Sequence, residues 1–75
     1  MTLDEAVDKA AREIDGAYER LIDAGCERMI ACGLTDEHVG DYIAEQRRSY
    51  GPWRVDTLAQ IRARLVAALA SDGIA

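Results

Sequence analysis

At 75 residues and 8.2 kDa the chain has room for one domain, and a fold of this size buries only about 60% of the surface that its unfolded chain exposes. The net charge is −5, from 9 basic and 14 acidic residues, which argues against a surface that binds nucleic acid or membranes. Hydrophobic residues make up 49% of the chain, but 13 of them are alanine and none is phenylalanine. We therefore expect a thin core, too small to support a catalytic cleft.

The sequence contains no segment typical of a membrane protein. The longest uninterrupted apolar run is Leu65 to Ala70, far short of the roughly 20 residues that a membrane span requires. The first ten residues carry charges where a signal peptide would be apolar. Cys26 and Cys32 are too few for a disulfide scaffold. These features predict a cytoplasmic protein with two reduced thiols and no membrane partner.

The first predicted helix begins at Thr2, whose position three residues before Glu5 is typical of a capping box. Its apolar residues follow at spacings of four and three, which places them along one seam: Leu3, Val7, Ala10, Ile14, Ala17, Leu21 and Ala24. If the helix continued past Gly25, Arg28 would fall in this seam and Ile30 on the charged side. The pattern therefore predicts a break at Gly25.

Three further helices are predicted after that break. A short one begins at Cys26 and ends at Gly33, with Leu34 supplying the apolar contact of a helix stop. Thr35 caps the next helix, whose apolar stripe contains Val39, Tyr42, Ile43, Gln46 and Tyr50. Gly51 and Pro52 are expected to end that helix and begin the last, because proline is best tolerated at a first helical position. The last helix is expected to end at Ser71–Gly73.

No segment alternates between apolar and polar residues with period two, so a sheet is not expected. The predicted fold class is all-α, a small bundle of three main helices plus one short helix, and residues 1–75 form a single helical domain. Arg62 falls inside the apolar stripe of the last helix. Its side chain could extend to the edge of the core, pair with an acid of the first helix, or contact a partner subunit.

Residues 26–44 resemble a helix-turn-helix, in which a glycine and an apolar residue link two short helices. Met29 departs from that pattern, because a small residue usually stands four positions before the glycine. The outward residues of the second helix are mostly acidic, namely Asp36, Glu37, His38, Asp41 and Glu45. Since such a surface repels DNA phosphates, DNA is not the expected partner, and a small DNA-binding regulator is kept as the alternative function.

The residue pattern predicts no catalytic, metal or cofactor site. Cys26, Cys32 and His38 are spaced six apart, whereas structural zinc sites use close cysteine pairs and four ligands. We expect either cysteine to be a buried thiol. His38 lies on an acidic helix face, and Ser49 and Ser71 are distant from it in sequence, so no pair of nucleophile and base is indicated unless the fold brings His38 to a cysteine. No glycine-rich phosphate loop is present. The protein is therefore not expected to be an enzyme.

The stretch from Tyr42 to Arg54 is the best candidate for a contact surface. It contains the only tryptophan, two of the three tyrosines and three of the eight arginines, residue types that are enriched at protein interfaces. Tyr42 and Tyr50 also lie on the apolar stripe, where packing in the core is the stronger interpretation. The candidate partner-binding residues are Arg47, Arg48, Trp53 and Arg54, together with the acidic residues Asp36, Glu37, Asp41 and Glu45.

The charges are divided unequally along the chain. Residues 1–45 have a net charge of −8, and residues 46–75 have a net charge of +3. We expect a small acidic protein–protein interaction module, for example a phage-encoded inhibitor that occupies the basic surface of a host defence complex. The alanines at positions 10, 17 and 24 would also allow close helix approach in a homodimer.

Overall fold

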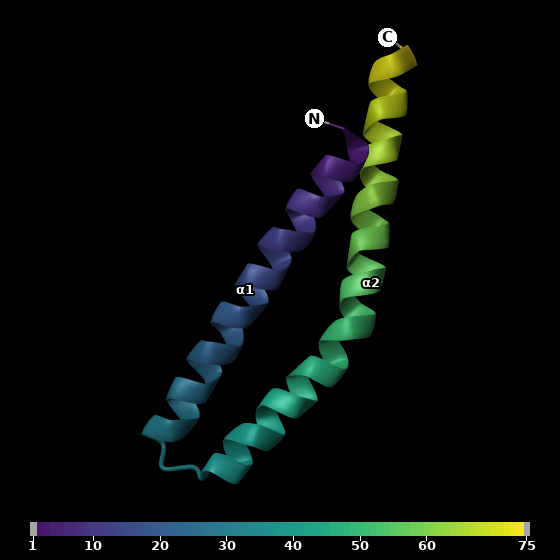
Figure 1. Cartoon of the computed structure of the whole chain (residues 1–75). Helices are drawn as coiled ribbons and strands as arrows, with labels where there is room; N and C mark the ends of the chain where they lie inside the picture. The colour runs from purple at the N-terminus through teal and green to yellow at the C-terminus, as the bar shows by residue number, and fades with distance from the viewer. Residues whose placement is uncertain (1, 75) are drawn as a thin grey trace.

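The computed structural model describes the backbone of residues 2–74 and the side chains of residues 2–70. Two long helices make up this part of the chain, α1 (Leu3–Ala31) and α2 (Asp36–Ile74). A short turn joins them, and α2 returns alongside α1 as an antiparallel hairpin (Figure 1). The all-α prediction is confirmed. The prediction of three main helices plus one short helix is wrong, because two of the expected breaks do not occur.

The start of α1 and the start of α2 lie where local hydrogen bonding predicted them, and the stop at Gly33, predicted for a separate short helix, ends α1. The Glu5 amide donates to Oγ1 of Thr2 at 3.1 Å, which caps α1. After Ala31, Gly33 adopts φ +83°, and the amides of Gly33 and Leu34 donate to the carbonyls of Ile30 and Met29, each at 3.0 Å. This pair of bonds is the Schellman motif. At the start of α2, the His38 amide donates to Oγ1 of Thr35 at 3.3 Å.

The predicted break at Gly25 is wrong, because α1 continues through it to Ala31. A Cβ added at Gly25 would lie 2.8 Å from Cζ of Tyr42, so the missing side chain lets the ring of α2 approach the backbone of α1. The break was predicted because a continuous helix would place Ile30 on the charged side. The helix is continuous, and Ile30 is indeed 60% exposed. The close contact of the Tyr42 ring accounts for a glycine at position 25, and the helix needs no break there.

The predicted boundary at Gly51–Pro52 is also wrong, because Pro52 lies inside α2. A proline removes one helical hydrogen bond and bends the helix, and Figure 1 shows α2 bending near its middle. The residue before a proline avoids helical geometry partly because its Cβ clashes with the proline ring. Gly51 has no Cβ, so this clash is absent. The backbone likewise stays helical through residues 71–73, where we expected the helix to end.

The hairpin is long and thin. Its extents are 59 × 18 × 15 Å and its radius of gyration is 17.3 Å, against about 11 Å for a compact domain of this length. Among residues 2–70, only Ile22 is buried, at 3% exposure. Several large apolar side chains remain exposed, namely Leu21, Ile30, Leu34, Trp53, Val55, Val66 and Leu69. Two helices alone leave much of this chain's apolar surface uncovered.

Candidate functional site

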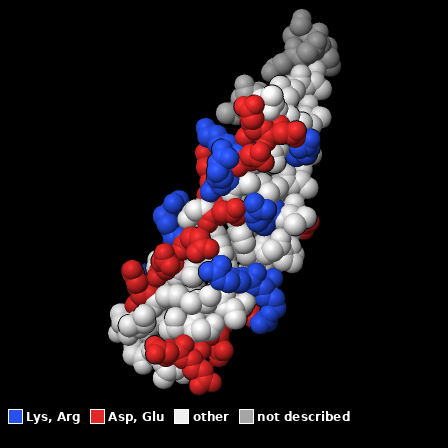
Figure 2. Space-filling model, viewed as in Figure 1, with Lys and Arg blue, Asp and Glu red and all other residues white. Residues whose placement is uncertain are grey.

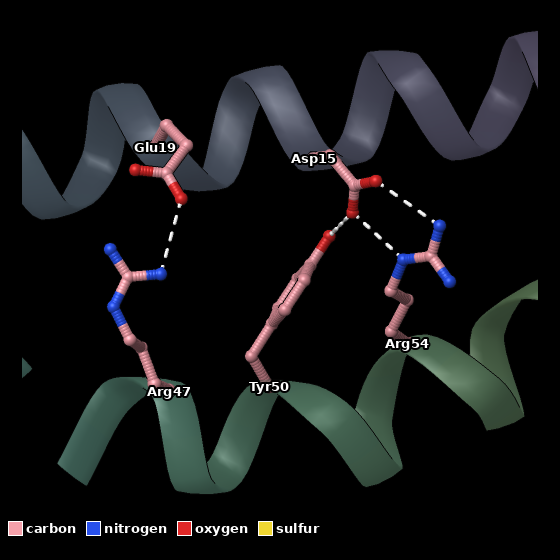
Figure 3. Close-up of polar contacts among 5 residues, drawn as sticks. All are labelled: Asp15, Glu19, Arg47, Tyr50 and Arg54. Carbon is pink, nitrogen blue, oxygen red and sulfur yellow. Dashed lines mark hydrogen bonds and ion pairs between the residues drawn. The ribbon is translucent and has the colours of Figure 1, made fainter. Parts of the chain in front are cut away.

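One side of the hairpin is crossed by ion pairs between the helices. Asp15 of α1 accepts from Nε and Nη2 of Arg54 at 2.8 and 3.1 Å. Tyr50 also donates its hydroxyl to Oδ1 of Asp15, and Nη1 of Arg47 lies 3.4 Å from Oε1 of Glu19 (Figure 3). We call this side the bridged face; its residues are Asp4, Asp15 and Glu19 of α1 and Arg47, Arg54 and Arg62 of α2.

The network around Asp15 shifts the acidity of its members. Hydrogen bonds from Arg54, and then from Tyr50, hold the pKa of Asp15 below its ordinary value. Partial burial, followed by the bond to Asp15, raises the pKa of Tyr50. The bond to Asp15 likewise raises the pKa of Arg54. All three shifts favour the charge states that the network requires, a carboxylate, a neutral phenol and a guanidinium.

An aromatic cluster lies beside this network at the middle of the hairpin. The rings of Tyr18 and Tyr50 stack with their centroids 3.8 Å apart and their planes at 13°. Trp53 lies against Tyr50 with a centroid separation of 5.6 Å. Burial raises the pKa of Tyr18, and its hydroxyl is enclosed without a hydrogen-bond partner among the described residues. The stack joins α1 to α2, while Trp53 stays 52% exposed.

The other side of the hairpin is hollowed and apolar. A hollow of about 390 Å³ is lined by Tyr18, Leu21, Gln46, Ser49, Tyr50 and Trp53. Further hollows on this side are lined mainly by uncharged residues, among them Ala6, Ala10, Ala24, Tyr42 and Leu65, and also by the charged residues Lys9, Glu13 and Arg28. Leu21 follows Asp15 by six residues, and Trp53 follows Arg47 by six, spacings that turn about 240° around a helix. We call this side the open face; it includes Ala6, Ala10, Leu21 and Ala24 of α1 and Tyr42, Gln46, Ser49, Trp53 and Leu65 of α2.

The third surface is acidic and lies at the turn end of the hairpin. Asp36, Glu37 and Asp41 are exposed at the start of α2, and none of them forms an ion pair within residues 2–70. Figure 2 shows one acidic group at this end and others along α1. We call residues Asp36, Glu37 and Asp41 the acidic tip.

The structure divides the predicted partner-binding residues among these surfaces. Arg47 and Arg54 pair with acids of α1 on the bridged face, and Trp53 lies on the open face. Arg48 pairs with Glu45 at 2.8 Å on the exposed surface of α2. The predicted residues therefore form no single patch. Of the three alternatives for Arg62, the structure shows the pair with α1, at 3.0 Å from Asp4.

Asp15 and Glu19, which bond to α2 across the helix interface, were not among the residues predicted from the sequence to make contacts. Asp15 and Glu19 lie one turn apart beside the apolar seam, a position that gave a weak signal of a polar contact across the interface. Their partners are 39 and 28 residues away. Only the alignment of the two helices in the hairpin decides which cations they meet.

The described residues contain no group of three or more His, Cys, Asp or Glu side chains that could hold a metal ion. Cys26 and Cys32 are free thiols; Cys26 is half-buried and Cys32 is exposed, so the expectation of a buried thiol is wrong for both. His38 contacts Oγ1 of Thr35 through Nδ1 at 3.0 Å, as part of the cap of α2. Within the described residues, neither helix has a stretch apolar and long enough to cross a bilayer.

In comparisons with known proteins, no protein-family model, no curated protein and no solved structure matches this chain.

Proposed function

We propose that this protein acts by binding another protein, and that its acidic tip contacts a basic surface of that partner. The supporting observation is the density of unpaired carboxylates there. Residues 18–50, which form the turn half of the hairpin because Tyr18 stacks on Tyr50, contain seven acidic and four basic residues. The three residues of the acidic tip are exposed and have no cationic partner within residues 2–70. A surface of this kind attracts a cationic surface and speeds association with it.

A protein with such an acidic surface would inhibit any partner whose function depends on the basic surface that it covers. The best-suited target is a protein whose basic surface binds nucleic acid, because carboxylates then compete directly with phosphates for the same cations. A phage-encoded inhibitor of a host defence complex is one example of such a pair. The cap at Thr35 already holds the start of α2 in helical form, so little order must be gained on binding.

The test is capture of a partner by the immobilised chain at about 50 mM and about 300 mM salt, followed by mass spectrometry. We expect a basic protein that is retained at low salt and released at high salt, because screening weakens contacts between exposed charges. The triple variant Asp36→Asn, Glu37→Gln, Asp41→Asn should lose that protein. If the triple variant retains it at both salt concentrations, the acidic tip is not the binding surface.

A matched control neutralises three exposed acids at the other end of α1, with Glu5→Gln, Asp8→Asn and Glu13→Gln. It changes the net charge by the same amount, so it should retain the partner. Equal loss of the partner in both variants would show that only overall charge matters, which contradicts a specific site at the acidic tip. Circular dichroism of both variants checks that the helices persist.

The DNA-binding alternative predicts a different result. A DNA-binding helix-turn-helix sets its two helices at about 90–120°, whereas α1 and α2 lie side by side in opposite directions (Figure 1). The acidic tip would also face the phosphates. We therefore expect no retention on duplex DNA at low salt, and retention that falls steeply as salt rises would overturn the protein-binding proposal.

A further inference from the structure

We infer that a second copy of this chain covers the open face and runs antiparallel to the first, so that two hairpins form a four-helix bundle. This inference concerns a different surface from the acidic tip and does not depend on the proposed function. It rests on the surface area of the hairpin, on the chemistry of the open face and on the distribution of charge along the molecule.

One chain exposes 5680 Å² of surface. A compact monomer of 8.2 kDa exposes about 4,500 Å² by the usual scaling of surface with mass. The excess is roughly 1,100 Å² per chain, while a stable interface buries about 800 Å² on each partner. The hairpin therefore exposes about as much extra surface as one dimer interface would cover.

On the open face, part of this excess exposed surface is apolar and forms a hollow. Leu21 is 64% exposed and Trp53 is 52% exposed, and both line the hollow of about 390 Å³. A cavity of about 150 Å³ holds a benzene molecule, so this hollow has room for an indole ring. The alanines of α1 on this side are small enough to let another helix approach closely. The bridged face, by contrast, is crossed by ion pairs that already satisfy its polar groups.

The position of the hollow favours an identical partner. Tyr18 and Leu21 lie near the middle of α1, which spans Leu3–Ala31. A two-fold axis through this region would bring the hollow of one copy against the hollow of the other. Each Trp53 could then enter its partner's hollow, since a two-fold interface is self-complementary. One surface thus supplies both the protruding side chain and the space that receives it.

The charges select the antiparallel orientation. Tyr18 stacks on Tyr50 and Glu19 lies against Arg47, so the turn half comprises residues 18–50; it has a net charge of −3, and the remaining residues have a net charge of −2. The difference between the two orientations therefore comes from the acidic tip. Two parallel copies would place the unpaired carboxylates of both acidic tips side by side, whereas antiparallel copies place the two acidic tips at opposite ends of the bundle. Charge repulsion is therefore smaller in the antiparallel bundle.

The test is the solution mass of the full chain, measured by sedimentation equilibrium between about 1 and 100 μM. We expect twice 8.2 kDa at the upper concentrations. Leu21→Glu should weaken self-association by about a hundredfold or more, because it would bury an unpaired charge. Val55→Glu is the matched control, since Val55 is equally exposed at 66% but does not line the hollows of the open face. It should remain a dimer.

Two further measurements do not depend on whether the Leu21 variant folds. Trp53 is the only tryptophan, so the fluorescence of the native chain should shift to the red on dilution as its indole returns to water. A spin label on Cys32 at the turn, in a Cys26→Ser background, should give a distance of about 35–40 Å between copies, from about 12 residues of helix on each side of the axis. A parallel dimer would bring the labels within about 20 Å.

A monomer mass at 100 μM would overturn the inference, as would a label distance below about 20 Å or a Leu21→Glu variant that dimerises normally. None of these outcomes involves the acidic tip. Loss of the dimer therefore leaves the proposed function standing, and loss of partner binding in the acidic-tip variant leaves the dimer standing.

Discussion

Two isoleucines of α1 make a paired test of where the stability of this protein comes from. Ile22 is 3% exposed, while Ile30 in the same helix is 60% exposed. Replacement of each by alanine removes the same atoms from very different surroundings. The structure therefore predicts unequal costs for two chemically identical substitutions.

The magnitude follows from burial. Loss of a fully buried isoleucine side chain to alanine costs about 2–5 kcal/mol, and a chain of this length has a total stability of roughly 4–11 kcal/mol. Ile22→Ala should therefore remove a large part of the free energy of unfolding. Ile30 buries less than half of its side chain, so Ile30→Ala should cost about 1 kcal/mol or less, partly offset by the better helix propensity of alanine.

The assay is urea denaturation followed by circular dichroism at 222 nm, with all chains at one concentration so that any association affects them equally. We expect a large fall in the midpoint for Ile22→Ala and a small one for Ile30→Ala, with unchanged slopes. Equal midpoint shifts in the two variants would refute the burial argument. So would a cost below about 1 kcal/mol for Ile22→Ala.

Four further substitutions test the interpretation of the backbone and the ion-pair network. Gly25→Ala should lower the melting temperature, because its Cβ would meet the ring of Tyr42, whereas Gly40→Ala meets nothing within 4 Å and should stabilise by up to about 1 kcal/mol. Pro52→Ala should stabilise the chain by up to about 3 kcal/mol and straighten α2, as small-angle scattering would detect; unchanged scattering would show that proline does not cause the bend. The pKa of Asp15 is lowered in the fold, so its contribution to stability is complete above its ordinary value of 3.8 and disappears as the pH falls below it. The gap in unfolding free energy between the native chain and Asp15→Asn should narrow between pH 6 and pH 2, and a constant gap would contradict the shift.

The candidate surfaces were only partly predictable. The acidic tip follows directly from the sequence, because Asp36, Glu37 and Asp41 stand together after a cap and charged residues remain at the surface. Arg47 and Arg54 looked equally available for a partner, but they pair with acids of α1. Such pairs join residues that are far apart in sequence, so composition and spacing carry no information about them.

The sequence by itself determined the helical class and the positions where α1 begins, where it ends and where α2 begins. Thr2, Gly33 and Thr35 form these boundaries through hydrogen bonds with residues at most five positions away. Interactions of this range act in any helix with the same local sequence, whatever the rest of the chain does. Local chemistry is therefore sufficient to place them.

Only the tertiary structure decided whether Gly25 and Pro52 interrupt their helices. Gly25 is a weak helix former and Pro52 a poor one, yet α1 and α2 continue through both. At Gly25 the ring of Tyr42 packs against the backbone, and around Pro52 the contacts of Tyr50 and Arg54 with Asp15 hold both sides of the bend to α1. Packing between two helices outweighs local preference there, and it exists only once the hairpin has formed.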